Sequence, residues 1–267
     1  MPFADVNGLR LYYERHGDSG DPLVFVHGYT GDISDWRLQI AAFNGDYRVL
    51  VMDLRGHGRS DAPVERRSYA IDLMATDVEE IVRLAGFDRF HLVGHSMGGA
   101  VAQEIALRSP QKLLSLTLED SAPKFDLPVD DALFQFRAQR LNLAQTQGMA
   151  AAAALEPPWL PPHMPPERLR ETDQRLARMS VDAFVAAARA LFDWRGATGR
   201  LSSIVVPTLV ICGDLDAPSF VEASRRMAQL IPNASLEIIP EASHSPQWER
   251  PDLFNRALRR HLDENRL

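Results

Sequence analysis

The stretch 90–102 constrains this chain more than any other, because it indicates a strand, a tight turn and a helix in direct succession. Its first residues are mostly apolar and suit a buried strand, and its last are small and suit a closely packed helix. Between them lies Ser96, flanked by Gly94 and Gly98. A serine at the apex of such a turn has a strained backbone, and side chains two residues away on either side would crowd it. The turn exposes the hydroxyl, and the following helix directs unpaired amides to the same place, so Ser96 is predicted to be a nucleophile.

The rest of the chain alternates apolar runs with segments of helical spacing. The Asn7-Gly8 pair between two short apolar segments predicts a tight hairpin. Further strands are expected at 9–13, 22–26, 48–53, 90–94, 113–118, 207–213 and 235–239, with helices at 33–43, 69–85, 97–108, 219–230 and 247–261. Strands that alternate with helices predict an α/β fold with a mostly parallel, eight-stranded sheet flanked by helices. In such sheets the functional residues gather in loops at the carboxyl ends of the strands.

The pattern changes in the middle of the chain. Residues 122–200 show helical spacing without a strand pattern, and three Pro-Pro pairs interrupt them. We interpret this region as a helical insertion into a core domain formed by 1–121 and 201–267.

Composition excludes several classes of function. The 267 residues carry a formal net charge of −7, which argues against nucleic acid and against an anionic membrane surface as partners. The one cysteine, Cys212, lies in an apolar run and excludes an intrachain disulfide framework. We see neither a signal-peptide pattern nor an apolar run of membrane-spanning length, and we therefore expect a soluble, cytoplasmic protein that is a monomer or a homodimer.

A serine hydroxyl needs an adjacent base, which a carboxylate orients in turn. Of the eight histidines, His244 alone lies in a late loop that follows a strand, and it is the predicted base. For the carboxylate we favour Asp216, because the order serine, acid, base along the chain then matches that of nucleophile-elbow enzymes. Asp120 and Asp214 are the alternatives; Asp120 follows the preceding strand, and Asp214 suits a turn cap.

An oxyanion intermediate needs two N–H donors. We expect one from the amide of Met97, directly after the serine. The other should come from the loop that begins His27-Gly28, where we favour the amide of Tyr29. No group of residues has the spacing of metal ligands and there is no phosphate-binding glycine motif, so we expect neither a metal nor another cofactor.

Together these motifs resemble those of the α/β-hydrolase fold superfamily, in its esterase, lactonase and haloperoxidase-like branch. The matching elements cover about 1–121 and 201–267 and include His27-Gly28, the segment 53–60, Gly94-His95-Ser96-Met97-Gly98-Gly99, the segment 207–216 and His244. The resemblance implies that 122–200 forms a cap over the active site. Because Ser96 stands where epoxide hydrolases and haloalkane dehalogenases have aspartate, the resemblance does not extend to those two groups.

The leading hypothesis is therefore a serine hydrolase that cleaves a small-molecule carboxylic ester through an acyl-enzyme. Aromatic residues of the cap suit a neutral or apolar acyl group better than a multiply charged one, and Trp159, Trp194 and Trp248 are the predicted substrate contacts. A lactonase or a carbon–carbon bond hydrolase is the enzymatic alternative, since the segment 247–249 resembles the latter, although His95 and residues 29–31 depart from its pattern. A ligand receptor on the same fold is the non-enzymatic alternative.

Overall fold

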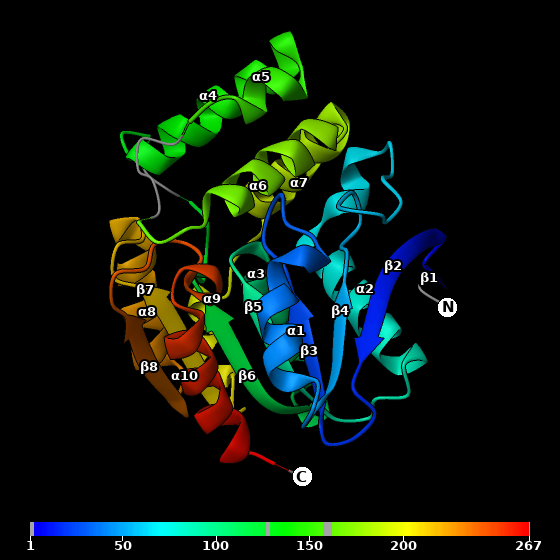
Figure 1. Ribbon diagram of the computed structural model, residues 1–267, viewed down its shortest axis with the longest axis vertical. Coiled ribbons are helices and arrows are strands. Elements are labelled where there is room, and N and C mark those ends of the chain that lie inside the picture. Colours follow the sequence, from blue (N-terminus) through cyan, green and yellow to red (C-terminus); the bar gives the residue numbers. More distant parts are fainter. Residues whose placement is uncertain (1–2, 127–128, 157–161, 267) are drawn as a thin grey trace.

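In the computed structural model, which describes residues 3–126, 129–156 and 162–266, the strands assemble into one sheet (Figure 1). The eight strands of the described residues are β1 (Phe3–Val6), β2 (Leu9–His16), β3 (Pro22–Val26), β4 (Arg48–Met52), β5 (Phe90–His95), β6 (Leu113–Glu119), β7 (Thr208–Gly213) and β8 (Ala234–Ile239). Their order across the sheet is β1-β2-β4-β3-β5-β6-β7-β8. The neighbours from β4 to β8 pair in parallel, whereas β1 and β2 pair antiparallel and β2 joins β4 antiparallel. The predicted α/β class and mostly parallel sheet are confirmed.

The first hairpin forms as the Asn-Gly pair predicts. Asn7 and Gly8 have φ angles of 51° and 78°, the left-handed conformation that a two-residue primed turn requires at both positions. The second strand continues to His16, three residues beyond the predicted end.

Helices cover both faces of the sheet. Helical segments of the described residues are η1 (Ile33–Trp36), α1 (Arg37–Phe43), η2 (Arg66–Tyr69), α2 (Ile71–Leu84), α3 (Met97–Arg108), η3 (Pro110–Lys112), α4 (Ala132–Gln147), α5 (Met149–Ala153), α6 (Pro166–Arg178), α7 (Val181–Asp193), η4 (Thr198–Ser203), α8 (Pro218–Leu230), α9 (Pro246–Glu249) and α10 (Pro251–Asp263). Helices α2, α3 and α8 pack on one face of the sheet, and α1 and α10 pack on the other (Figure 1). The strands between the two layers are buried on both sides, which explains their continuous apolar runs.

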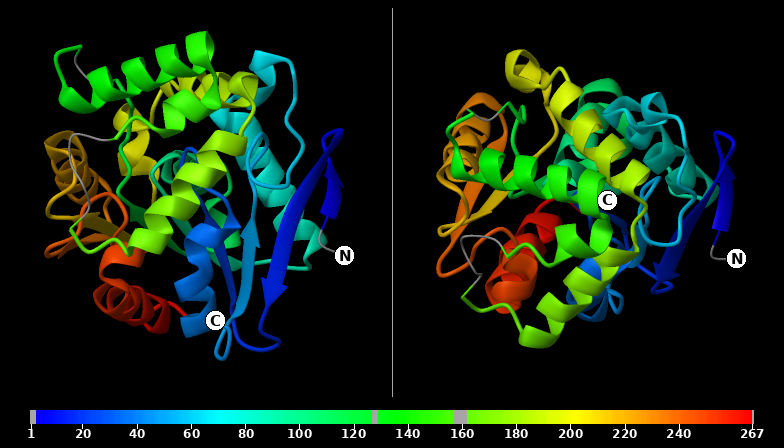
Figure 2. Two further views of the ribbon diagram at one scale, coloured as in Figure 1. Left: turned by 45° about the horizontal axis from the view of Figure 1, so that its top comes forward. Right: turned by 90° about the horizontal axis from the view of Figure 1, so that it is seen from above.

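Helices α4 to α7 gather at one end of the sheet, and residues of α7 also join the main apolar core. The four helices lie above the sheet in Figure 1 and across it when the molecule is seen from above in Figure 2. Each of the four helices contributes buried residues to a second, smaller apolar cluster, apart from the two that pack against the sheet. Trp159, which is predicted to contact the substrate, lies outside the described residues.

The last predicted helix is wrong in one respect, because two helices occupy the segment 247–261. Arg250, between α9 and α10, has φ −135° and ψ 58°. The cause is Pro251, whose ring disfavours the helical conformation for the residue before it and which lacks an N–H. This break separates α9, which directly follows the loop that carries His244, from α10. Among the described residues, no helix combines the length and apolarity that crossing a bilayer requires.

Candidate active site

Ser96 lies at the apex of the turn between β5 and α3. Its backbone has φ 51° and ψ −112°, a conformation that costs free energy for a residue with a side chain. A strained serine between a strand and a helix is characteristic of the nucleophile elbow. The sharp turn holds Oγ of the serine away from the backbone of both elements.

The two flanking glycines are required for steric reasons, as the sequence predicts. A Cβ at Gly94 would overlap the carbonyl oxygen of Gly98, and a Cβ at Gly98 would overlap that of Val26 in the neighbouring strand β3. Both obstacles are backbone atoms and cannot move aside. The glycines therefore let α3 begin directly against the sheet, with Ser96 held at its amino end.

Ser96, His244 and Asp216 form one hydrogen-bonded chain, although 148 residues separate the serine from the histidine in sequence. Nε2 of His244 lies 3.1 Å from Oγ of Ser96, and its Nδ1 lies 2.8 Å from Oδ2 of Asp216. The other carboxylate oxygen of Asp216 accepts a 2.7 Å hydrogen bond from the amide of Ala217. One carboxylate bond at Nδ1 leaves Nε2 of a neutral His244 free to accept the serine proton.

The two alternative carboxylates lie in different environments. Asp214 is exposed, whereas Asp120 is fully buried and its Oδ1 accepts a hydrogen bond from the amide of Gly213 at 3.0 Å. Burial, together with the nearby Asp216 and Glu119, raises the pKa of Asp120 well above its usual range. Within the described chain Oδ2 of Asp120 has no hydrogen-bond partner. Asp216 is therefore the carboxylate bonded to His244.

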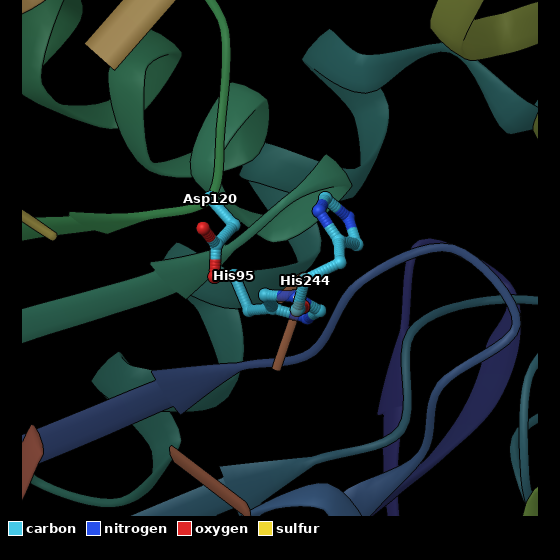
Figure 3. A group of neighbouring side chains, drawn as sticks. All are labelled: His95, Asp120 and His244. Atoms are coloured by element: carbon cyan, nitrogen blue, oxygen red, sulfur yellow. The ribbon is translucent and has the colours of Figure 1, made fainter. Parts of the chain in front are cut away.

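Figure 3 shows His95, Asp120 and His244 side by side, and one ligand atom from each lies within 4.8 Å of the others. Sequence spacing does not reveal this cluster. Both ring nitrogens of His244 are already engaged by Ser96 and Asp216, so the ring has no lone pair left for a cation. Nε2 of His95 instead donates to the backbone carbonyl of His244 at 2.8 Å, and burial lowers the pKa of His95 to about 4. A neutral His95 thus fixes the loop that carries His244.

The two predicted oxyanion donors lie at the same site. Tyr29 lines the cavity beside Ser96, and Met97 follows the serine as the first residue of α3. Neither backbone amide donates to another described residue. The Tyr29 hydroxyl donates to the carbonyl of Phe184 at 2.8 Å, and the two rings stack with centroids 5.2 Å apart, which ties this loop to α7.

A cavity of about 240 Å³ opens onto Ser96 and His244. Two of its walls are helix faces: Leu133, Phe136, Arg137, Arg140 and Leu141 of α4, and Phe184, Ala188, Leu191 and Phe192 of α7. The sequence indicates aromatic residues in this region but does not identify the two arginines as part of the lining. Their i, i+3 spacing on the same stripe as Leu133 and Leu141 is the signal that would have placed them there.

The prediction that Trp194 and Trp248 contact the substrate is wrong, because neither residue lines this cavity. The indole N–H of Trp194 donates to Glu104 at 2.7 Å inside the core, and that of Trp248 donates to the carbonyl of Asp35 at 2.8 Å. Each indole is buried, and a buried indole N–H needs a hydrogen-bond acceptor. Both acceptors lie away from Ser96, and they hold the two rings outside the cavity.

A buried group of charges joins α6 to the loop after β3, close to the site. Asp35 accepts hydrogen bonds from Arg168 and, at 2.8 Å, from Arg175. Burial alone would raise the pKa of Asp35, but the two guanidinium groups outweigh it and hold the pKa at about 2. No local pattern in the sequence indicates this contact, because its partners are more than 130 residues apart.

We predict that Asp35→Asn lowers the free energy of unfolding at pH 7 by about 3 kcal/mol or more, because Arg168 and Arg175 lose the buried counter-ion that they share and keep only the more exposed Glu171 and Asp32. The contribution of the carboxylate is fully present above the unfolded pKa of about 4 and is lost as the pH falls toward the folded pKa. The difference between the two proteins, measured by urea denaturation, should therefore be smaller at pH 3 than at pH 7. Glu237→Gln, which breaks the exposed pair with Arg260, is the matched control and should cost less than about 1 kcal/mol. A difference that does not change with pH would contradict this account.

Comparison with known proteins places these observations in a family. A family model described as the alpha/beta hydrolase fold matches residues 21–251. A relative from Azorhizobium caulinodans, provisionally named carbamate hydrolase RutD, is 30% identical over 273 residues, which is 97% of each chain. The crystal structure of the enol-lactonase from Burkholderia xenovorans is similar with a TM-score of 0.88 and 29% identity, over 98% of this chain and 100% of that one. A thermophilic esterase from Thermogutta terrifontis has a TM-score of 0.85 and 28% identity, over 100% and 98%.

Proposed function

The chain belongs to the alpha/beta hydrolase fold family, and from that premise we propose that it is a serine hydrolase that cleaves carboxylic esters through an acyl-enzyme. The hydrogen-bonded chain from Ser96 through His244 to Asp216 carries this proposal. It gives a weakly nucleophilic hydroxyl an adjacent base, and it gives that base an orienting carboxylate.

In the first half of the reaction, Oγ of Ser96 attacks the ester carbonyl carbon while Nε2 of His244 takes the hydroxyl proton. The tetrahedral intermediate collapses, the C–O bond of the ester breaks, and His244 gives its proton to the departing alcohol. Asp216 holds the Nδ1–H of the ring and stabilises the imidazolium that forms between the two proton transfers. In the second half, water attacks the acyl-serine with His244 again as base, which releases the acid and restores Ser96.

The tetrahedral oxyanion would be bound by the backbone amides of Tyr29 and Met97. Tyr29 lines the cavity, Met97 directly follows Ser96, and neither amide donates to another described residue. Preorganised amides of this kind are worth about 10²–10³-fold in rate for each donor.

We assign the helices of 122–200 the role of a cap over a core formed by 1–121 and 201–267. The assignment is supported by the cavity, because α4 and α7 supply two of its walls while Ser96 and His244 come from loops at the carboxyl ends of the strands. The cap would exclude water from the acyl group and select the substrate by shape.

A lactone is the second candidate substrate. The observation that favours it is the similarity, along nearly the whole chain, to a structure named an enol-lactonase. The chemistry is the same in each step, except that the leaving alcohol stays attached to the acyl group and departs with it.

The experiment that tests the proposal is rapid-mixing hydrolysis of p-nitrophenyl esters and of a lactone series. We expect a burst of about one equivalent of p-nitrophenol per enzyme molecule, followed by slower turnover. Ser96 should gain the mass of the acyl group less one hydrogen when the reaction is quenched during the burst. Release of p-nitrophenol without a covalent adduct would contradict the acyl-enzyme. Hydrolysis of no ester and no lactone would contradict the proposed function.

A further inference from the structure

One face of α4 combines apolar and cationic side chains. Leu133, Phe136, Arg137, Arg140 and Leu141 recur with the i, i+3, i+4, i+7, i+8 spacing of a single helical stripe, and all five line the cavity above Ser96. An apolar stripe alone would serve packing. Two guanidinium groups on the same stripe instead bring positive charge into a small and otherwise mainly apolar cavity.

Neither arginine is fully satisfied by the protein. Nη1 of Arg137 is buried without a hydrogen-bond partner among the described residues, and the same holds for Nε of Arg140. Arg140 uses its Nη2 to donate to the carbonyl of Leu155 at 2.9 Å. A buried N–H without an acceptor costs free energy, and more so when the group is charged.

Aromatic rings hold the two side chains but do not supply acceptors. The guanidinium carbon of Arg137 lies 5.7 Å from the ring centroid of Phe220, and that of Arg140 lies 4.4 Å from that of Phe136. Such contacts orient the planar groups and offset part of their desolvation. They leave the N–H groups of the guanidinium plane available for a ligand.

No carboxylate of the described residues forms an ion pair with either arginine, although Asp216 and Asp131 act on Arg137, and Asp173 on Arg140, at longer range. The one carboxylate in its lining is Asp216, whose two oxygens are bonded to His244 and to the amide of Ala217. Burial lowers the pKa of both arginines, which reflects the cost of keeping their charge in this environment. A ligand that carries an anion would remove that cost.

We propose that Arg137 and Arg140 form an anion subsite and that the substrate is an ester or lactone bearing a free carboxylate. This inference rests on the proposed function and adds the chemical class of its substrate. The forked guanidinium geometry matches the two oxygens of a carboxylate, and the apolar walls between the arginines and Ser96 suit a short hydrocarbon link to the reacting carbonyl. It revises the expectation of a neutral or apolar acyl group, because that expectation considers the aromatic residues of the cap and omits its arginines.

The test compares two esters with the same leaving group and nearly the same shape. Mono-p-nitrophenyl succinate ends in a carboxylate, and p-nitrophenyl 4-methylpentanoate has an isopropyl group in its place. We expect the wild type to have the higher kcat/KM for the succinate ester, and Arg137→Met to lower the ratio of the two values by about 10- to 100-fold, the loss of one charge-assisted contact. Arg137→Lys keeps the charge without the fork and should lose less. The burst amplitude with the neutral ester counts functional active sites in each preparation.

A matched control separates local contact from overall charge. Arg189→Met removes one positive charge from exposed surface on α7, outside the cavity lining, and should leave the ratio within about twofold of that of the wild type, because an exposed charge is screened. A wild-type preference for the neutral ester, or equal ratios in wild type and Arg137→Met, would overturn the subsite while the burst still supports the hydrolase.

A binding measurement keeps the subsite testable if neither ester reacts. Glutarate is titrated calorimetrically into the wild type, Arg137→Met and Arg140→Met. A Kd raised about tenfold or more in each variant supports the anion subsite independently of turnover. Unreacted esters with arginine-dependent glutarate binding would reject the hydrolase and keep the subsite, and unreacted esters with no such binding would reject both.

Discussion

Ser96→Ala is expected to lower kcat/KM for a p-nitrophenyl ester by about 10⁴-fold or more and to abolish the burst. The reason is that alanine removes the atom that attacks the carbonyl while the oxyanion donors and the cavity remain. The measurement is stopped-flow release of p-nitrophenol, with denaturant unfolding of the same samples to show that the fold is kept.

The size of this loss discriminates between functions. Ser202→Ala, an exposed serine in η4, is the matched control and should retain the wild-type burst and rate. If Ser96→Ala kept more than about a tenth of the wild-type rate, hydrolysis would not proceed through this serine. A ligand receptor or direct attack by water would then explain the site better.

Asp216→Asn should lower kcat by about 10⁴-fold, whereas Asp120→Asn should lower it by less than about tenfold. Asparagine at position 216 removes the charge that stabilises the imidazolium of His244 and permits the wrong tautomer of the ring. At position 120 the carboxyl is buried and makes no hydrogen bond to His244, its burial raises its pKa, and an asparagine keeps the acceptor for the amide of Gly213. The two substitutions are chemically identical, so the comparison isolates the position of the carboxylate.

Steady-state kinetics at pH 7 to 8 with burst titration of active sites measures both effects. Equal losses in the two variants would mean that Asp120 shares the orientation of His244. A larger loss in Asp120→Asn would reverse the assignment of the carboxylate.

The sequence is informative where local geometry decides the outcome. Glycine is required at 94 by a backbone oxygen four residues away and at 98 by one in the adjacent strand. The Asn7-Gly8 turn is required by φ angles that few residues adopt. Periodicity locates the strands because those between the helical layers are buried on both faces. Ser96, Asp216 and His244 each follow a strand, and the carboxyl ends of parallel strands meet at one edge of the sheet, so the sequence indicates that these residues lie close together.

The sequence is less informative where distant segments meet. By residue type alone, Trp194 and Trp248 cannot be distinguished from the aromatic residues that line the cavity. Their hydrogen bonds to Glu104 and to the carbonyl of Asp35 hold them elsewhere, and these partners are distant in sequence. The break at Arg250 is the opposite case: the sequence analysis expects one helix over 247–261, although the local effect of Pro251 on the residue before it is enough to indicate a break.

By itself, the sequence determined the α/β sheet, the strained serine turn and the residues able to act as base and acid, because each depends on spacing along the chain. Only the tertiary structure decided which carboxylate bonds to His244, that Asp120 is buried, and that Arg137 and Arg140 line the cavity with N–H groups that have no acceptor among the described residues. The physical reason is that hydrogen bonding, burial and electrostatic compensation depend on which surfaces meet in space. The spacing of residues along the chain does not show which surfaces come into contact in the folded protein.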